Sequence, residues 1–366
     1  MIMDLSDYGW DDSFEESFKE FRENNLLPAR VIEPNRLGYK LVSENGVING
    51  RLSEKFSKNC LFRVGLPTVG DWVAFQPREL TGFVSIQGLV KRKSKFSRKV
   101  IGTGSEEQVI AANIDTIFVV SGLDRDYNIR RLERYAILAG DSNAELVFIL
   151  NKADLCKELE EAISEIKRSF PVTPVYALSA LNNQGLEQLA SHINKGKTIV
   201  FLGSSGAGKS TIINLLLGEN RQKTGNVSAY TGKGMHITSS KNLIVLPSGA
   251  MVIDTPGLRE LQLLCSGAGL NSTFSDIEDL AAECKYKTCT HTNEPKCAVT
   301  NAVKDGLLSE ERVDSYRKLK REIIYNLMRR DAQYKNKKSK FSKNISRRAK
   351  QIKKSRESAG DKYMGK

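Results

Sequence analysis

The run of residues 198–213, T-I-V-F-L-G-S-S-G-A-G-K-S-T-I-I, constrains the fold more than any other part of the chain. Residues 198–202 are apolar and β-rich, which predicts a buried strand. The motif G-x-x-x-x-G-K-S follows at residues 203–210, and helix-compatible residues come after it. A strand, a glycine-rich loop and a helix in this order indicate a phosphate-binding loop at a helix N-terminus. The alternative is a glycine-rich turn that matches by chance. We expect the chain to bind a nucleoside triphosphate.

Each residue of this loop has an expected role. Its glycines let backbone N–H groups turn inward around phosphate oxygens. We expect Lys209 to reach the outer phosphates and to act in catalysis, and Ser210 to bind Mg²⁺. The residues expected to surround the phosphates are Gly203, Ser204, Ser205, Gly206, Ala207, Gly208, Lys209, Ser210 and Thr211.

A second motif, Asn151-Lys152-Ala153-Asp154, follows another apolar run, residues 145–150. In an N-K-x-D arrangement the Asp carboxylate accepts two hydrogen bonds from guanine, which adenine cannot donate. After the next predicted strand, residues 174–178, Ser179 and Ala180 are suited to placing a backbone N–H near the guanine carbonyl oxygen. The motif alone is a weak signal, but its position after a strand strengthens it. GTP and GDP are the expected ligands.

The third motif is Asp254-Thr255-Pro256-Gly257, which follows the β-rich run 251–253. An Asp at a strand end that reaches the Mg²⁺ shell, followed by a Gly that meets the γ-phosphate, is typical of GTPase switches. Upstream, Thr238 is the candidate switch threonine on Mg²⁺, with Thr231 as its rival. An ordinary loop threonine is the alternative interpretation of Thr238.

The order of the three motifs is unusual, because the guanine motif precedes the phosphate loop, which precedes the switch motif. The strands can still assemble the same sheet, so the sequence predicts a circularly permuted GTPase domain. The switch then leads directly into the C-terminal region.

The N-terminal part has a different pattern. Residues 1–27 are acidic, with phenylalanines at helical spacing, and we interpret them as a packing arm. Residues 28–100 contain about five short β-rich runs, which predict a small barrel; an OB fold fits, and an SH3-like barrel would give the same pattern. The basic run 91–99 is interpreted either as a solvated linker or as an RNA contact.

A compact set of metal-ligand residues lies near the C-terminus: Cys284, Cys289, His291 and Cys297. Three thiolates and one imidazole form a closed tetrahedral set of the kind that holds structural Zn²⁺. The alternative is four buried residues without metal. A helix with an apolar face is predicted from about residue 309 onward.

The net charge of +13 belongs to the C-terminal end, because residues 317–366 hold 19 Lys and Arg against 4 Asp and Glu. A dense basic tail on a near-neutral body indicates a polyanion partner, with RNA first. No apolar run approaches the length of a membrane span, and the six cysteines suit a reducing compartment. We expect a cytoplasmic protein, without a membrane partner and monomeric.

Across roughly residues 30–325 the chain resembles the ribosome small-subunit-dependent GTPases of the RsgA type. The resemblance rests on the permuted motif order, on G-D-W-V at residues 70–73, on A-A-N-I-D at residues 111–115 and on the run C-K-Y-K-T-C-T-H-T-N-E-P-K-C-A-V at residues 284–299. It implies an OB domain, a permuted GTPase domain and a zinc domain. It also implies late action in small-subunit maturation and GTP hydrolysis stimulated by that subunit.

The resemblance also implies roles for individual residues. It assigns guanine contacts to Asn151, Lys152 and Asp154, and zinc binding to the Cys3His set. Leu258 stands where many GTPases have a water-orienting glutamine. The family is similar in lacking it, and His236 matches a switch histidine suggested as the substitute, although Ile237 departs from the usual threonine after that histidine.

The predicted fold is multidomain α/β: an N-terminal OB-type β-barrel, a circularly permuted P-loop GTPase domain and a C-terminal zinc-binding helical domain. The expected segments are an arm (1–27), the barrel (28–100), the GTPase domain (101–265), the zinc domain (266–330) and a basic tail (331–366). The leading hypothesis is a GTPase that binds the small ribosomal subunit and its rRNA. The alternatives are an RNA-binding scaffold with a regulatory, poorly hydrolysing GTP site and, disfavoured by Asn151 and Asp154, an ATP-dependent kinase or ATPase.

Overall fold

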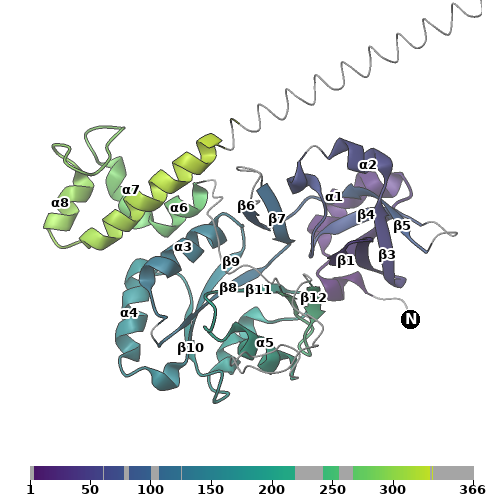
Figure 1. Cartoon of the computed structure of the whole chain (residues 1–366), viewed down its shortest axis with the longest axis horizontal. Helices are drawn as coiled ribbons and strands as arrows, with labels where there is room; N and C mark the ends of the chain where they lie inside the picture. Colours follow the sequence, from purple (N-terminus) through teal and green to yellow (C-terminus); the bar gives the residue numbers. More distant parts are fainter. Residues whose placement is uncertain are drawn as a thin grey trace, which may run out of the picture.

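The computed structural model describes residues 4–60, 62–77, 82–99, 107–124, 126–218, 242–254, 267–329 and 332. A central α/β sheet carries a β-barrel on one side and a small helical module on the other (Figure 1). The barrel reaches the sheet edge through contacts between β1 (Leu27–Asn35) and β12 (Asn242–Val245). None of the helices in these ranges combines the length and the apolar character needed to cross a bilayer.

The barrel is closed in the order β1-β2-β3-β5-β4. All its neighbouring strands are antiparallel except β3 and β5, which are parallel. This five-stranded arrangement is that of an OB fold. Its remaining elements are β2 (Gly38–Ser43), β3 (Gly46–Leu52), α2 (Glu54–Asn59), β4 (Trp72–Gln76) and β5 (Val84–Leu89).

The N-terminal arm packs on the barrel, as its aromatic spacing predicted. A 3-10 helix (Leu5–Tyr8) precedes α1 (Asp12–Glu23), whose Phe14 and Phe18 are buried beside Trp72. β4 has apolar side chains on the outside of the barrel, and the arm covers them to complete the cluster.

Of the two interpretations of residues 91–99, the solvated linker is contradicted for residues 95–99. The strand β6 (Lys95–Lys99) pairs with β7 (Glu107–Ala112) in a separate two-stranded sheet. The Arg92 guanidinium is nearly buried and makes a bidentate ion pair with Asp71, at 2.7 Å to each carboxylate oxygen. Arg92 is consequently committed inside the fold rather than presented to RNA.

The central sheet has the order β10-β9-β8-β11-β13-β12, and all pairs except β12–β13 are parallel. Its elements in chain order are β8 (Thr116–Gly122), α3 (Ile129–Gly140), β9 (Glu145–Asn151), α4 (Leu159–Ser169), β10 (Val175–Leu178), a 3-10 helix (Leu186–His192), β11 (Thr198–Leu202), α5 (Lys209–Leu217), β12 and β13 (Met251–Asp254). The chain runs outward from β8 to β10 and then returns to the centre with β11. The strand order therefore reverses between β8 and β11, and open α/β sheets bind ligands outside the carboxyl ends of strands at such a point.

Both faces of the sheet are covered, which explains the continuous apolar runs in its strands. Ile199 and Phe201 of β11 face a cluster that includes α5, whereas Val200 and Leu202 face a cluster that includes α3 and α4. The second cluster continues into the helical module, since Val299 and Tyr316 belong to it. The module thus shares a core with the sheet.

The module contains α6 (Ala268–Thr273), α7 (Ser275–Ala282), α8 (Ala298–Lys304) and a helix over residues 310–329. Arg312, on this last helix, joins the module to the sheet. Its guanidinium binds Asp276 of α7 at 2.7 and 2.8 Å and the fully buried Glu133 of α3 at 3.1 Å. Ser315 donates to the second oxygen of Glu133 at 2.6 Å. A single guanidinium therefore bridges carboxylates from both parts.

We expect Arg312→Met to lower the free energy of unfolding by about 1.5 to 3 kcal/mol, because the buried Glu133 keeps its contacts with Arg130 and Ser315 but loses the guanidinium that ties it to the module. The measurement is urea unfolding of the full chain. Lys318→Met on an exposed position of the same helix is the control, expected to stay within about 0.5 kcal/mol of the parent. Equal stability of the two variants would show that Arg312 does not hold the junction.

Candidate nucleotide site and cysteine–histidine cluster

The phosphate loop begins where β11 ends and closes at Gly208, directly before α5. The first N–H groups of a helix have no partner within the helix, and the helix dipole favours an anion there. Lys209 lies in this first turn, and its ammonium donates to the backbone oxygens of Gly203 at 2.8 Å and Ser204 at 2.5 Å. The loop is therefore held in shape by the lysine that the sequence assigns to the phosphates.

Asn151 joins two of the sequence motifs. It is the last residue of β9 and is buried. Its Nδ2 donates to the carbonyl oxygen of Ala207 in the phosphate loop at 2.8 Å, and its Oδ1 accepts from the N–H of Ala180 at 3.0 Å. One amide side chain thus fixes the loop after β11 to the loop after β10.

Lys152 and Asp154 follow at the same edge of the sheet. Lys152 has a left-handed backbone, with φ of 65°, and its ammonium contacts the Asp124 carboxylate at 2.5 Å. This hydrogen bond holds the pKa of Asp124 below its usual range. Asp154 is exposed and lies in the 3-10 helix Ala153–Leu155. In the loop after β10, the Ser179 hydroxyl accepts from the N–H of Asn182 at 3.3 Å. The residues predicted for guanine are thereby gathered on two loops that Asn151 holds together.

Asp254 ends β13, the strand beside β11, so its carboxylate lies at the same sheet edge as the phosphate loop. Burial raises the pKa of Asp254. A nearby divalent cation would offset this by favouring the charged form. Gly257, Thr231, His236 and Thr238 lie outside the described residues, as does Cys265.

The four predicted metal ligands meet in one cluster. The ligand atoms of Cys284, Cys289, His291 and Cys297 all lie within 4.8 Å of one another. His291 Nδ1 is 3.6 Å from the sulfurs of Cys284 and Cys297, which are themselves 3.8 Å apart. Two thiolates about 2.3 Å from a tetrahedral zinc ion lie about 3.8 Å apart, so the donor set fits Zn²⁺.

Neighbouring elements fix the position of this cluster. The Cys297 sulfur accepts from the Thr300 N–H at 3.4 Å and caps α8. The Arg317 guanidinium donates to the backbone oxygen of His291. In the intervening turn, hydrogen bonds from Thr290 are the main cause that lowers the pKa of Glu294 to about 2. Contacts with α8 and with the helix over residues 310–329 thus hold the cluster in position.

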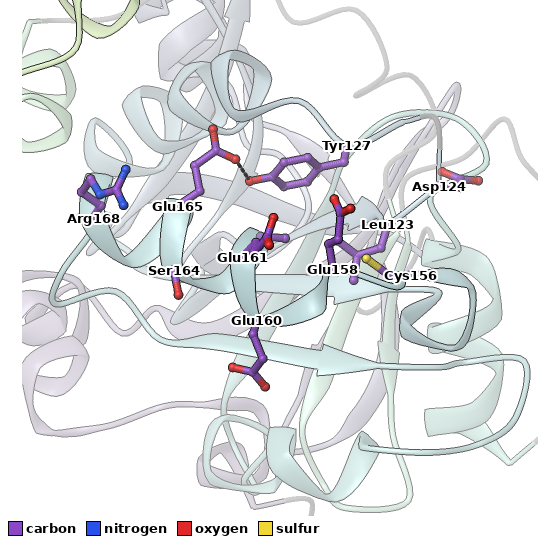
Figure 2. Close-up of a pocket in the computed structure, with 11 residues that line it drawn as sticks. Leu123, Asp124, Tyr127, Cys156, Glu158, Glu160, Glu161, Ser164, Glu165 and Arg168 are labelled. Carbon is purple, nitrogen blue, oxygen red and sulfur yellow. Dashed lines mark hydrogen bonds between the residues drawn. The ribbon is translucent and has the colours of Figure 1, made fainter.

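A surface depression of about 670 Å³ lies beside the guanine motif, between α4 and the loop after β8, and contains no phosphate-loop residue (Figure 2). Five carboxylates and one guanidinium line it: Asp124, Glu158, Glu160, Glu161, Glu165 and Arg168. Its negative charge would repel a triphosphate. The depression is therefore not the nucleotide site.

The loop between β8 and α3 was not predicted from the sequence as part of the site. Ser204 of the phosphate loop donates to the Asp126 carboxylate, and Asp124 holds Lys152, so both carboxylates contact predicted site residues. The sequence does carry a signal for it: residues 116–121 are an apolar run like those of the neighbouring strands. A loop after such a strand emerges on the same side of the sheet as the other motifs.

We expect Gly208→Ala to destabilise the nucleotide-free protein more than Gly206→Ala. Both glycines have positive φ, 100° and 83°, so backbone strain affects both variants. A Cβ at 208 would lie 1.9 Å from Asn151 Nδ2, whereas a Cβ at 206 meets nothing within 4 Å. The difference in unfolding free energy should be at least about 1 to 3 kcal/mol, the range for displacing a buried amide from its partners. Equal losses in urea unfolding would contradict the packing of Asn151 against the loop.

The chain matches sequence models of known families. The model of the RsgA GTPase family matches residues 89–264, and a model described as 50S ribosome-binding GTPase matches residues 198–354. Among solved structures, a circularly permuted GTPase, YloQ, is similar with a TM-score of 0.60 and 25% identity over 81% of this chain and 95% of that one. YjeQ from Thermotoga maritima has a TM-score of 0.62 at 24% identity, over 82% of this chain and 99% of that one, and supports the same fold.

Full-length relatives agree on one description. Small ribosomal subunit biogenesis GTPase RsgA of Opitutus terrae is 44% identical over 90% of this chain and 92% of its own length. The protein of the same name from Syntrophotalea carbinolica is 42% identical over 88% of this chain and 90% of its own. With the permuted order of its motifs, its five-stranded barrel and its Cys3His cluster, the chain belongs to the RsgA family of small ribosomal subunit biogenesis GTPases, which are GTP hydrolases.

Proposed function

We propose that one guanosine nucleotide binds across the loops after β9, β10 and β11. The observation that carries this proposal is the pair of hydrogen bonds from Asn151 to Ala207 and Ala180. In the proposed complex Asp154 accepts from the guanine N–H groups, Lys152 lies along the base, and the Ala180 loop faces the guanine carbonyl oxygen. Adenine would leave the Asp154 carboxylate unpaired, which favours GTP and GDP.

The proposed phosphate contacts come from residues 203–211. Lys209 would exchange its loop carbonyls for the outer phosphates, and Ser210, Asp254 and Thr238 would hold Mg²⁺, which neutralises charge on the phosphates. Gly257 is proposed to meet the γ-phosphate through its backbone N–H. His236 is proposed to orient the attacking water, since Leu258 cannot do so.

The Cys3His cluster is proposed to hold one structural Zn²⁺. The spacing of its donor atoms supports this, and four protein ligands leave no coordination position for catalysis. The metal would then stabilise the module that Arg312 joins to α3.

We further propose that the partner is the small ribosomal subunit, contacted through its rRNA late in maturation. The names of the full-length relatives support the subunit, and the basic residues within 317–366 support RNA contact. Hydrolysis would be slow in isolation and stimulated by docking. The chain is proposed to act as a monomer in the cytoplasm, with the arm, barrel, GTPase domain, zinc domain and tail bounded as the sequence predicts.

We expect small ribosomal subunits to raise GTP turnover by at least about tenfold, measured as phosphate release by the full chain, because docking would complete a site that lacks a glutamine. Lys209→Ala should lose turnover under both conditions, and His236→Ala should bind GTP normally but lose the stimulated rate. Equal turnover with and without subunits would favour the scaffold with a regulatory GTP site. Parental turnover in the His236 variant would remove its catalytic role.

One zinc ion per chain is expected by metal analysis of the purified protein. Cys289→Ser should reduce this content and lower the melting temperature, because it removes one of four ligands. Cys156→Ser, which lies outside the cluster, is the matched control and should keep one zinc. Full zinc content in the Cys289 variant would argue against the proposed ligand set.

A further inference from the structure

The loop between β8 and α3 lies where the strand order of the sheet reverses. Its described residues are 123, 124 and 126–128. β8 is the direct neighbour of β11, so this loop and the phosphate loop emerge side by side from parallel strands. It belongs to none of the three sequence motifs. Its position places it against the nucleotide site proposed above.

Two carboxylates of this loop each accept a hydrogen bond from a residue of one sequence motif. Asp124 Oδ2 accepts from the Lys152 ammonium of the guanine motif at 2.5 Å. Asp126 Oδ2 accepts from the Ser204 hydroxyl in the phosphate loop. The two residues are also connected, because the backbone N–H of Asp126 donates to Asp124 Oδ1 at 3.1 Å. The loop consequently forms a second bridge between the motifs, independent of Asn151.

A carboxylate next to a triphosphate would weaken binding unless its charge were balanced. Arg131, in the first turn of α3, supplies that balance. Its guanidinium makes an ion pair with Asp126 Oδ1 and lies 3.4 Å from the Asp126 backbone oxygen. Asp126 therefore has one oxygen for Ser204 and one for Arg131. It can fix the loop without presenting an unbalanced negative charge to the phosphates.

The loop is also anchored on its far side. Asn128 accepts from the Arg131 N–H at 3.2 Å and caps α3. The Tyr127 hydroxyl donates to Glu165 of α4 at 2.5 Å, and Figure 2 shows these two side chains pointing toward each other at the edge of the acidic depression. With both ends anchored, Asp126 is a fixed point against which the phosphate loop can be held.

We propose that Asp126 is a positioning residue for the phosphate loop and acts through Ser204. The Ser204 backbone oxygen is one of the two that accept from Lys209. Holding the Ser204 side chain thus sets the part of the loop from which Lys209 must move toward the phosphates. This inference rests on the proposed nucleotide site and adds a residue to it.

The test is the affinity of the full chain for a fluorescent GDP analogue, together with kcat and KM for GTP. Asp126→Ala and Ser204→Ala should each raise the Kd for GDP about tenfold, the loss expected for one hydrogen bond to a charged group. The Kd of the double variant should be no higher than that of the single variant that binds GDP less tightly, because both changes remove the same contact. Asp126→Asn keeps one acceptor oxygen, which can serve Ser204 but then loses the contact with Arg131, so it should raise the Kd less than Asp126→Ala.

Glu160→Ala is the matched control, since it removes an exposed carboxylate of the nearby acidic depression without touching the loop. Its Kd should stay within about twofold. Parental affinity in Ser204→Ala, or additive losses in the double variant, would overturn the role of Asp126 even if Asp126→Ala folds poorly. Failure of the unaltered protein to bind GDP would instead overturn the proposed site and this inference together.

Discussion

The buried amide of Asn151 is the contact on which the arrangement of the site depends. It joins Ala207 of the phosphate loop to Ala180, two positions that follow different strands of one parallel sheet. Ala207 follows β11, at the centre of the sheet, and Ala180 follows β10, the outermost strand on one side. Because an amide offers both a donor and an acceptor, it can satisfy two backbone groups of opposite kind. A shorter or apolar side chain could not hold both loops.

The same sheet explains how the chain tolerates a permuted motif order. Parallel strands present their carboxyl ends on the same side of the sheet whatever their order along the chain. The guanine motif, the phosphate loop and Asp254 of the switch motif therefore lie on that side. The permutation does change which part of the chain comes after the switch motif. The next described residues after β13 belong to the helical module, whose apolar core is continuous with that of α3. Arg312 of this module adds an ionic contact to Glu133. Docking of the module and the position of α3 are therefore physically connected.

Much of this could be predicted from sequence, because the relevant signals are local. The strand Thr198–Leu202 has the predicted limits, and the four metal ligands are brought together as expected. The missed features depend on distant partners. In the sequence Arg92 is one residue of a basic run, and only the fold shows that it forms an ion pair with Asp71. Asp126 carries no motif, and its contact with Ser204 spans 78 positions of the chain.

The most direct test of a single shared nucleotide is the base preference of Asp154→Asn in the full chain. Xanthine has an oxygen where guanine has its exocyclic amine, so an asparagine amide can pair with xanthine as a carboxylate pairs with guanine. If Asp154 and Lys209 contact one nucleotide, the variant should hydrolyse XTP in preference to GTP, and adding Lys209→Ala should abolish that turnover. An unchanged preference for GTP, or XTP turnover that survives loss of Lys209, would contradict a single nucleotide shared by the two motifs.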